Sequence, residues 1–290
     1  MWSNQRTESA VQRRWPQYFE LFDVAFDDMP ISQLELERVR ATEAETFNRM
    51  VTERGDFNPF DDAGWKLLRV RFGEAARASR LDTLLDIGCG TGHSRQVYRE
   101  SVRHYVGVDL SEVAIERARA LFPADTFQVA DAHALPFPDA SFDAVAFSSV
   151  LHHIPDFARA LIEGARVLRP GGVVFAFDPN LMHPAMALFR WPRSPFYSSA
   201  GVSPNERPLL GGELRRAFVA AGLRDVRQRA QSGIAYRAVA LQSLNRLLAA
   251  YNLFDAAFER SGLARWFGTF LITWGTKPPS AASQPATSSA

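Results

Sequence analysis

The sequence contains a single cysteine, Cys89, which excludes an internal disulfide and any cysteine-rich zinc site. It also lacks an excess of charge, because 33 Lys+Arg stand against 32 Asp+Glu in 290 residues. A net charge of +1 gives no electrostatic argument for a nucleic-acid partner. No apolar run approaches the length of a membrane span, and the polar residues 1–18 do not resemble a secretory signal. We therefore expect a cytoplasmic protein with no integral membrane association.

The predicted secondary structure changes near residue 81. Residues 1–80 predict an N-terminal helical cap, whereas short strands alternate with helices over 81–276. This alternation predicts an α/β protein with a doubly wound, mostly parallel sheet. Two insertions interrupt it, a proline-rich and aromatic loop at 179–210 and a helical segment at 235–262. The Pro/Ser/Ala-rich tail, 277–290, is predicted to be disordered.

The most informative segment is residues 84–92, L-L-D-I-G-C-G-T-G. An apolar strand runs directly into the glycine turn Gly88-Cys89-Gly90, and a carboxylate, Asp86, precedes it. Glycines allow backbone angles closed to other residues and let a ligand lie against bare main chain. A turn of this kind between a strand and a helix predicts a site for a nucleotide-like ligand.

Three further strand ends carry polar residues. Asp109, followed by Leu110, ends the second predicted strand, and a carboxylate there suits the two hydroxyls of a ribose. Asp131, followed by Ala132, ends the third and is placed to meet the amino group of an adenine, while Ser148 ends the fourth. Because the carboxyl ends of parallel strands share one edge of the sheet, these residues predict a single ligand site.

A nicotinamide dinucleotide is the main competing ligand, because Asp109 lies about twenty residues after the glycines. Three details argue against it. The glycine spacing is G-x-G-x-G rather than G-x-G-x-x-G, Asp86 precedes the glycines, and the acidic site offers nothing to neutralise phosphates. An adenosine that carries a positive centre fits better.

At this point the chain resembles the class I S-adenosylmethionine (SAM)-dependent methyltransferases, especially their type 11 group. The matching motifs are L-L-D-I-G-C-G-T-G at 84–92, V-G-V-D-L-S at 106–111, D-A-H-A-L-P-F-P-D-A-S-F-D at 131–143 and R-V-L-R-P-G-G at 166–172.

The resemblance implies a seven-stranded sheet whose last strand is antiparallel. It also implies that the glycine turn faces the methionine part of the cofactor, Asp109 the ribose, and Asp131 with Ala132 the adenine. Residues before 80 and after 178 match less clearly, and in this family those parts hold the acceptor.

Two adjacent histidines, His152 and His153, follow the fourth predicted strand. Adjacent residues of a regular element face different directions, so we expect at most one to reach the acceptor. In similar O-methyltransferases a histidine at this place is a base and an acid follows strand five, where Asp178 lies here. His153 is our first choice as base and His152 the second, with Asp178 orienting the imidazole. Local hydrogen bonding explains the histidines equally well.

Other chemistry is less favoured. Cys89 lies within the glycine turn with no base beside it in sequence, so we expect it to offer backbone to the cofactor rather than a nucleophile. The candidate metal ligands Asp178, Asn180 and His153 are too few and too loosely spaced, so no metal is predicted. The insertion has three arginines and no lysine between 235 and 260, a weak basic face for a helix on a membrane surface.

We therefore expect a SAM-dependent methyltransferase that acts on a small, largely apolar acceptor, at a hydroxyl and with a histidine base. Carbon methylation of a quinone-like acceptor is one alternative, because an acidic carbon needs no nearby histidine. A non-catalytic module that binds the cofactor is the other. The sequence leaves the oligomeric state open.

Overall fold

The computed structural model describes residues 33–55, 58–76, 81–154, 156–191, 194–196, 203, 205–237 and 242–279. The chain divides into two compact units, residues 1–38 and 39–290, with the boundary inside helix α3 (Gln33–Arg54). Residues 1–32 of the predicted cap and residues 280–290 of the predicted tail lie outside the described residues. The second unit carries the sheet and all the candidate site residues.

Seven strands form one sheet in the order β3-β2-β1-β4-β5-β7-β6. Strand β1 pairs in parallel with both β2 and β4, whereas β7 is antiparallel to β5 and β6. This confirms the predicted fold class, including the antiparallel last strand. The strands are β1 (Leu81–Ile87), β2 (Val102–Asp109), β3 (Thr126–Val129), β4 (Phe142–Ser148), β5 (Leu168–Pro179), β6 (Arg224–Gln231) and β7 (Phe270–Thr276).

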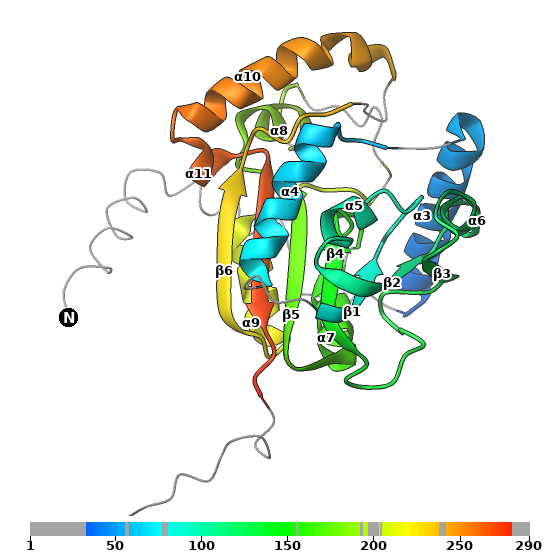
Figure 1. Ribbon diagram of the computed structural model, residues 1–290. Helices are drawn as coiled ribbons and strands as arrows, with labels where there is room; N and C mark the ends of the chain where they lie inside the picture. The colour runs from blue at the N-terminus through cyan, green and yellow to red at the C-terminus, as the bar shows by residue number, and fades with distance from the viewer. Residues whose placement is uncertain are drawn as a thin grey trace, which may run out of the picture. The chain divides into compact units, whose positions relative to one another are not determined.

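Helices cover both faces of the sheet (Figure 1). One face carries α4 (Asp62–Ala75), α5 (Arg95–Tyr98) and α6 (Glu112–Leu121), whose apolar residues share a core with β1, β2 and β5. The other carries α7 (Phe157–Val167) and α9 (Gly211–Ala220). The central strands are buried on both sides, which is why they are continuous apolar runs rather than alternating ones.

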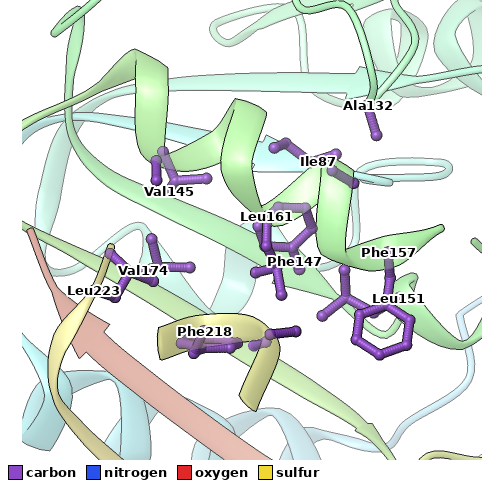
Figure 2. Close-up of a cluster of buried hydrophobic side chains, with 14 of the residues drawn as sticks. Ile87, Ala132, Val145, Phe147, Leu151, Phe157, Leu161, Val174, Phe218 and Leu223 are labelled. Carbon is purple, nitrogen blue, oxygen red and sulfur yellow. The ribbon is translucent and has the colours of Figure 1, made fainter. Parts of the chain in front are cut away.

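The core beneath α7 and α9 combines aliphatic and phenylalanine side chains (Figure 2). Phe147 of β4 lies beside Leu161 of α7, and Phe218 of α9 lies near the same cluster. A Cβ at Gly164 would come within 3.0 Å of the Phe147 ring, so this glycine lets α7 approach the sheet closely. Full burial of each such side chain contributes about 1.5–3 kcal/mol to folding.

The remaining elements follow the carboxyl ends of parallel strands. The 3₁₀ helix η1 (Leu151–His153) follows β4, and α8 (Pro184–Arg190) follows β5. The segment before β7 contains η2 (Gln242–Leu247), α10 (Leu248–Arg260) and α11 (Ala264–Phe267). Figure 1 shows α8 and α10 beyond the ends of β5 and β6. The order of strands reverses between β1 and β4: β2 and β3 follow on one side of β1, and β4 and β5 follow on the other. Open α/β sheets bind ligands at such a point.

Three segments differ from what their residues alone suggest. The segment after the glycine turn contains only a short helix, Arg95–Tyr98, because turns continue from the glycines as far as Ser94. Pro170-Gly171-Gly172 is a sequence typical of a turn, but it lies within β5, because Gly171 and Gly172 exchange backbone hydrogen bonds with Lys277 and so extend the pairing with β7. Helix α4, expected in a separate cap, packs directly on the sheet through Phe72.

Candidate active site

The glycine turn leaves β1 with left-handed backbone at Gly88 and Gly90, whose φ values are +73° and +52°. A Cβ at Gly88 would lie 2.4 Å from Cβ of Val150, so the segment after β4 packs tightly on the turn. A Cβ at Gly90 would meet nothing within 4 Å. The backbone of Gly90 therefore faces open space, as a turn that receives a ligand requires.

Beneath the turn, Asp86 is completely buried and accepts three hydrogen bonds from hydroxyls. Ser94 Oγ and Tyr105 Oη donate to Oδ2 at 2.5 and 2.6 Å, and Ser148 Oγ donates to Oδ1 at 2.6 Å. Tyr98 Oη lies 2.7 Å from Ser148 Oγ and completes the network. Burial raises the pKa of Asp86 from 3.8 to about 6, although the three hydroxyls oppose the shift. Asp86 and Ser148, both predicted to contact cofactor, thus hold β1, β2 and β4 together under the turn.

Asp109 at the end of β2 supports the turn from the side. Its Oδ2 accepts the amide of Gly90 at 2.9 Å, and its Oδ1 accepts the amide of Ser111 at 2.9 Å. Burial raises the pKa of Asp109, and these two amides counteract part of that shift. Each carboxylate oxygen accepts more than one hydrogen bond, so the group keeps capacity for further donors. Leu110 beside it is half-buried.

Asp131, after β3, contacts a histidine and an arginine. The backbone amide and Nδ1 of His133 lie 2.9 and 3.1 Å from Oδ1, and Arg40 Nη2 lies 2.9 Å from Oδ2. Burial opposes ionisation, but the bonds from His133 and the charge of Arg40 lower the pKa of Asp131 overall. Ala132 is buried in the core beside it.

Cys89 has a buried thiol whose Sγ lies 3.7 Å from the carbonyl oxygen of Gly90. Burial raises the pKa of this thiol well above its usual range, and the nearby carboxylates of Asp109 and Asp86 reinforce the shift. A thiol held protonated is a poor nucleophile, which agrees with a role for Cys89 through its backbone.

Helix α3 supplies a layer of contacts that the sequence did not suggest. Besides Arg40, Asn48 Oδ1 accepts Ser111 Oγ at 2.7 Å. Phe47 packs edge-on against the His153 ring at 5.0 Å between centroids. Glu43 is buried, with Oε2 3.5 Å from His153 Nδ1. These residues meet partners far away in the chain, and no local motif marks them.

The two histidines lie together, contrary to the expectation that they face different directions. Their ring centroids are 4.1 Å apart, because the 3₁₀ turn η1 replaces a regular strand or α-helix. Asp178 pairs with His152, whose Nδ1 lies 2.9 Å from Oδ1. His153 Nδ1 instead lies 3.1 Å from Ser203 Oγ, next to Glu43. Asp178, which we expected to orient the base, therefore contacts His152 and not His153, and which histidine acts as a base stays a prediction.

Their surroundings push the pKa values of these histidines in opposite directions. Burial and the neighbouring His153 lower the pKa of His152 by more than Asp178 raises it. Burial opposes protonation of His153 as well, but the hydrogen bond and charge of Glu43, with Glu206, raise its pKa overall. Burial raises the pKa of Asp178, partly offset by the bonds from His152. The surroundings therefore favour the neutral form of His152 and the charged form of His153.

A second buried group follows β5. His183 is completely buried, and neither ring nitrogen has a hydrogen-bond partner among the described residues. Its Nε2 lies 3.8 Å from Asp255 Oδ1, and its ring packs edge-on against Tyr251 and Phe258 of α10. Asp255 accepts Thr269 Oγ1 at 2.5 Å. Burial lowers the pKa of His183, so this side chain favours its neutral form.

No group of three or more His, Cys, Asp or Glu residues in the described part of the chain is arranged to hold a metal ion. The residues that sequence reasoning missed are of two kinds. Ser94, Tyr98 and Tyr105 surround Asp86, and Arg40, Glu43 and Asn48 come from α3. Hydroxyl-bearing and charged residues are common in any sequence, so only their distant partners distinguish them.

Comparison with known families identifies the central part of this molecule. Residues 85–176 match the family described as a methyltransferase domain. For these residues the match confirms the predicted resemblance to the class I SAM-dependent methyltransferases, type 11 group, and with it the enzyme class and cofactor predicted for this domain.

Two curated relatives are informative. The chain is 46% identical over 99 residues to 27-O-demethylrifamycin SV methyltransferase of Amycolatopsis mediterranei (strain S699), over 31% of this chain and 36% of that protein. It is 40% identical over 102 residues to 2-methyl-6-phytyl-1,4-hydroquinone methyltransferase of Synechocystis sp., over 34% of this chain and 32% of that protein. The matches span about a third of the length of these relatives.

Among solved structures, the [4+2]-cyclase SpnF superposes with a TM-score of 0.55 at 21% identity, covering 82% of this chain and 96% of that one. At this identity the likeness shows the fold alone. It extends well beyond residues 85–176, so the segments outside the family match also belong to a shared architecture.

Proposed function

We propose that this protein transfers a methyl group from SAM to a hydroxyl of a small, largely apolar acceptor, with His152 as the general base. The observation that carries this proposal is the pairing of His152 with Asp178 at the carboxyl ends of β4 and β5. The pair lies in the segment that packs on the glycine turn, since Val150 is the residue in contact with Gly88.

The turn has the properties that an adenosine with a sulfonium requires. Gly90 leaves its backbone open, Asp109 retains acceptor capacity for ribose hydroxyls, and the carboxylates nearby favour a positive ligand. When bound, SAM supplies a methyl group already activated by the sulfonium. The protein then needs to place the acceptor, exclude water and remove a proton.

His152 is suited to removing that proton. Its Nδ1 is engaged by Asp178, which fixes the ring and leaves Nε2 as the nitrogen that accepts a proton. The lowered pKa of His152 keeps the imidazole neutral near pH 7. When the acceptor hydroxyl loses its proton to Nε2, the imidazolium that forms is balanced by the Asp178 carboxylate.

The names of two relatives support an oxygen acceptor without fixing its identity. The Erwinia billingiae relative, 42% identical over 91 residues, is named a malonyl-[acyl-carrier protein] O-methyltransferase, and the Amycolatopsis relative is named for a 27-O-demethyl substrate. The Synechocystis relative is named for a hydroquinone, which keeps a quinol-like acceptor as the second candidate. One solved structure with the same fold is named a [4+2]-cyclase, so the experiment must also be able to detect a protein that transfers no methyl group.

The experiment measures transfer of radioactive methyl from SAM to a panel of phenols, sugars, macrocyclic alcohols and quinols. On an active acceptor, His152→Ala should lower kcat by about 10²–10⁴-fold and leave S-adenosylhomocysteine affinity within about twofold. The matched variant is His153→Gln, which removes the neighbouring charge. Because that charge lowers the pKa of His152, its loss should move the acid limb of the rate profile to higher pH while most of kcat remains.

Full turnover of His152→Ala on a phenol or alcohol would exclude His152 as the base. Turnover confined to quinols, and insensitive to His152→Ala, would favour the carbon acceptor. Tight binding of S-adenosylhomocysteine without transfer to any acceptor of the panel would favour the non-catalytic module.

A further inference from the structure

The outward face of α10 and α11 is apolar. Leu253 is 73% exposed, Phe254 52% and Trp266 65%. Leu247 and Leu263 are also more than half exposed. Along the helix, Leu247, Ala250, Leu253, Phe254 and Ala257 recur at spacings of three and four residues, which places them on one stripe.

The opposite stripe of α10 is already packed against the protein. Leu248 and Asp255 are buried, and Tyr251 and Phe258 contact His183. Asp255 Oδ2 also accepts the amide of Gly233 at 2.6 Å, which fixes the helix on the segment after β6. The apolar stripe therefore cannot turn inward, and α10 is apolar on both its packed and its outward sides.

The charge of this surface has one sign. Between residues 245 and 267, all of which are described, the exposed charged side chains are Arg246, Arg260 and Arg265. The two acids in the segment are turned away, since Asp255 is buried and Glu259 Oε2 accepts the amide of Ser232. Arg265 lies over the Trp266 ring at 5.6 Å from its centroid.

We propose that the outward surface of α10 and α11 binds an anionic lipid membrane surface, with Leu253, Phe254 and Trp266 inserted among the acyl chains. The few arginines give α10 a weak basic face, so the exposed Leu253, Phe254 and Trp266 supply most of the attraction to a membrane interface. Arg260 and Arg265 beside them favour anionic headgroups. None of the helices in the described residues is long and apolar enough to cross a bilayer, so the contact is interfacial.

A second copy of the chain fits this surface less well. Most homodimers are isologous, so the same patch would face itself and bring Arg260 and Arg265 of each copy together. Residues 245–267 contain no exposed acid. An anionic headgroup layer supplies the opposite charge over the whole patch, and each arginine near it contributes about 1 kcal/mol.

The test is cosedimentation of the full chain with vesicles of equal parts phosphatidylglycerol and phosphatidylcholine, and with phosphatidylcholine alone. The protein should bind the anionic vesicles and lose binding as salt is raised. The double variant Leu253→Glu, Phe254→Glu should weaken binding at least tenfold, since each side chain contributes about 1.5–3 kcal/mol on burial. Arg260→Gln and Arg265→Gln should each weaken it about fivefold.

Ile162→Glu on α7 is the matched control, because Ile162 is 52% exposed on a different helix. It should leave vesicle binding unchanged, and circular dichroism should show all variants folded. Absence of binding to anionic vesicles at low salt, or an equal loss in Ile162→Glu, would overturn the proposal. So would a dimer, detected by analytical ultracentrifugation without lipid, that the double variant dissociates. The measurement needs no methyl transfer, so it succeeds or fails separately from the proposed function.

Discussion

The buried polar groups differ between two regions of this molecule. One is the proposed cofactor side, around the glycine turn, and the other is the proposed acceptor side, around His152, Asp178 and His183. On the cofactor side, Asp86, Asp109 and Asp131 each accept two or more hydrogen bonds from the protein itself. On the acceptor side, Asp178 Oδ2 and both ring nitrogens of His183 have no such partner among the described residues. The carboxylates of the first region all accept hydrogen bonds from the protein, whereas the second region holds buried polar atoms without a protein partner among the described residues.

This difference separates what the fold requires from what a substrate supplies. A buried polar atom without a partner costs about 1–3 kcal/mol, so a folded chain retains one where something else satisfies it. The carboxylates Asp86 and Asp109 hold the glycine turn and lie within the matched family segment, 85–176. Asp178 and His183 follow β5 and lie outside that segment.

The largest effect is expected at Asp86, whose pKa shift can be measured as a pH dependence of stability. Its pKa of about 6 in the fold, against 3.8 ordinarily, means that the folded state binds the proton more tightly. Stability therefore falls as pH rises from about 4 to about 6 and stays lower above, by about 3 kcal/mol. Asp86→Asn removes this dependence, so the difference in free energy of unfolding between the two proteins should change by that amount in urea titrations across this range.

Tyr105→Phe is a companion to that measurement. It removes one donor to Asp86 and should raise the pKa of the carboxyl further, moving the transition to higher pH. The free energies of unfolding of the wild-type protein and of Asp86→Asn could instead change in parallel from pH 4 to 7. That result would show that the pKa of the Asp86 carboxyl is the same in the folded and unfolded states, which would contradict the prediction.

The next effect concerns the open space at Gly90. A methyl group there meets no protein atom, so Gly90→Ala should weaken S-adenosylhomocysteine binding at least tenfold, about 1.4 kcal/mol, as measured by calorimetric titration. Gly171→Ala is the control, because its φ of +83° imposes similar backbone strain of about 1–2 kcal/mol and its Cβ is also unobstructed. Equal affinities in the two variants would place the cofactor away from Gly90.

The smallest effect is expected at Arg40, which connects the two sides through α3. Its ion pair with Asp131 is partly exposed, so Arg40→Ala should change the free energy of unfolding by about 1 kcal/mol or less. The same change leaves Asp131 Oδ2 free for an adenine amino group and should tighten S-adenosylhomocysteine binding by at most about fivefold. Arg49→Ala, on the exposed side of α3, should change neither. Weaker cofactor binding in Arg40→Ala would mean that Arg40 itself holds the ligand.

The sequence was sufficient to predict the sheet because its signals are local. Leu84 and Leu85 form an apolar run ending at glycines, and Ser111 caps α6 through the amide of Ala114 at 3.0 Å. The family match over 85–176 covers the region where these signals are densest. The ends of strands and helices are harder to predict where a turn-forming sequence also pairs with another strand. Gly171 is an example, because it continues β5 through its hydrogen bond with Lys277.

The acceptor side was less predictable because its contacts are long-range. Glu43 meets His153 across 110 residues, and no periodicity in α3 marks that residue. Which ring Asp178 reaches follows from the shape of a three-residue 3₁₀ turn, and the sequence does not show that shape. The catalytic roles of His152, His153 and Asp178 stay predictions. So do the roles toward the cofactor of Asp86, Gly88, Cys89, Gly90, Asp109, Leu110, Asp131, Ala132 and Ser148.

The single thiol gives the protein a built-in reporter. Cys89 lies inside the glycine turn, and a Cβ at Gly107 would come within 2.8 Å of its Sγ, so reagent reaches it only when the turn opens. The rate of disulfide exchange with a small aromatic disulfide therefore measures the free energy of that local opening. With no second cysteine to interfere, the unlabelled wild-type chain reports how strongly each ligand closes its own binding loop.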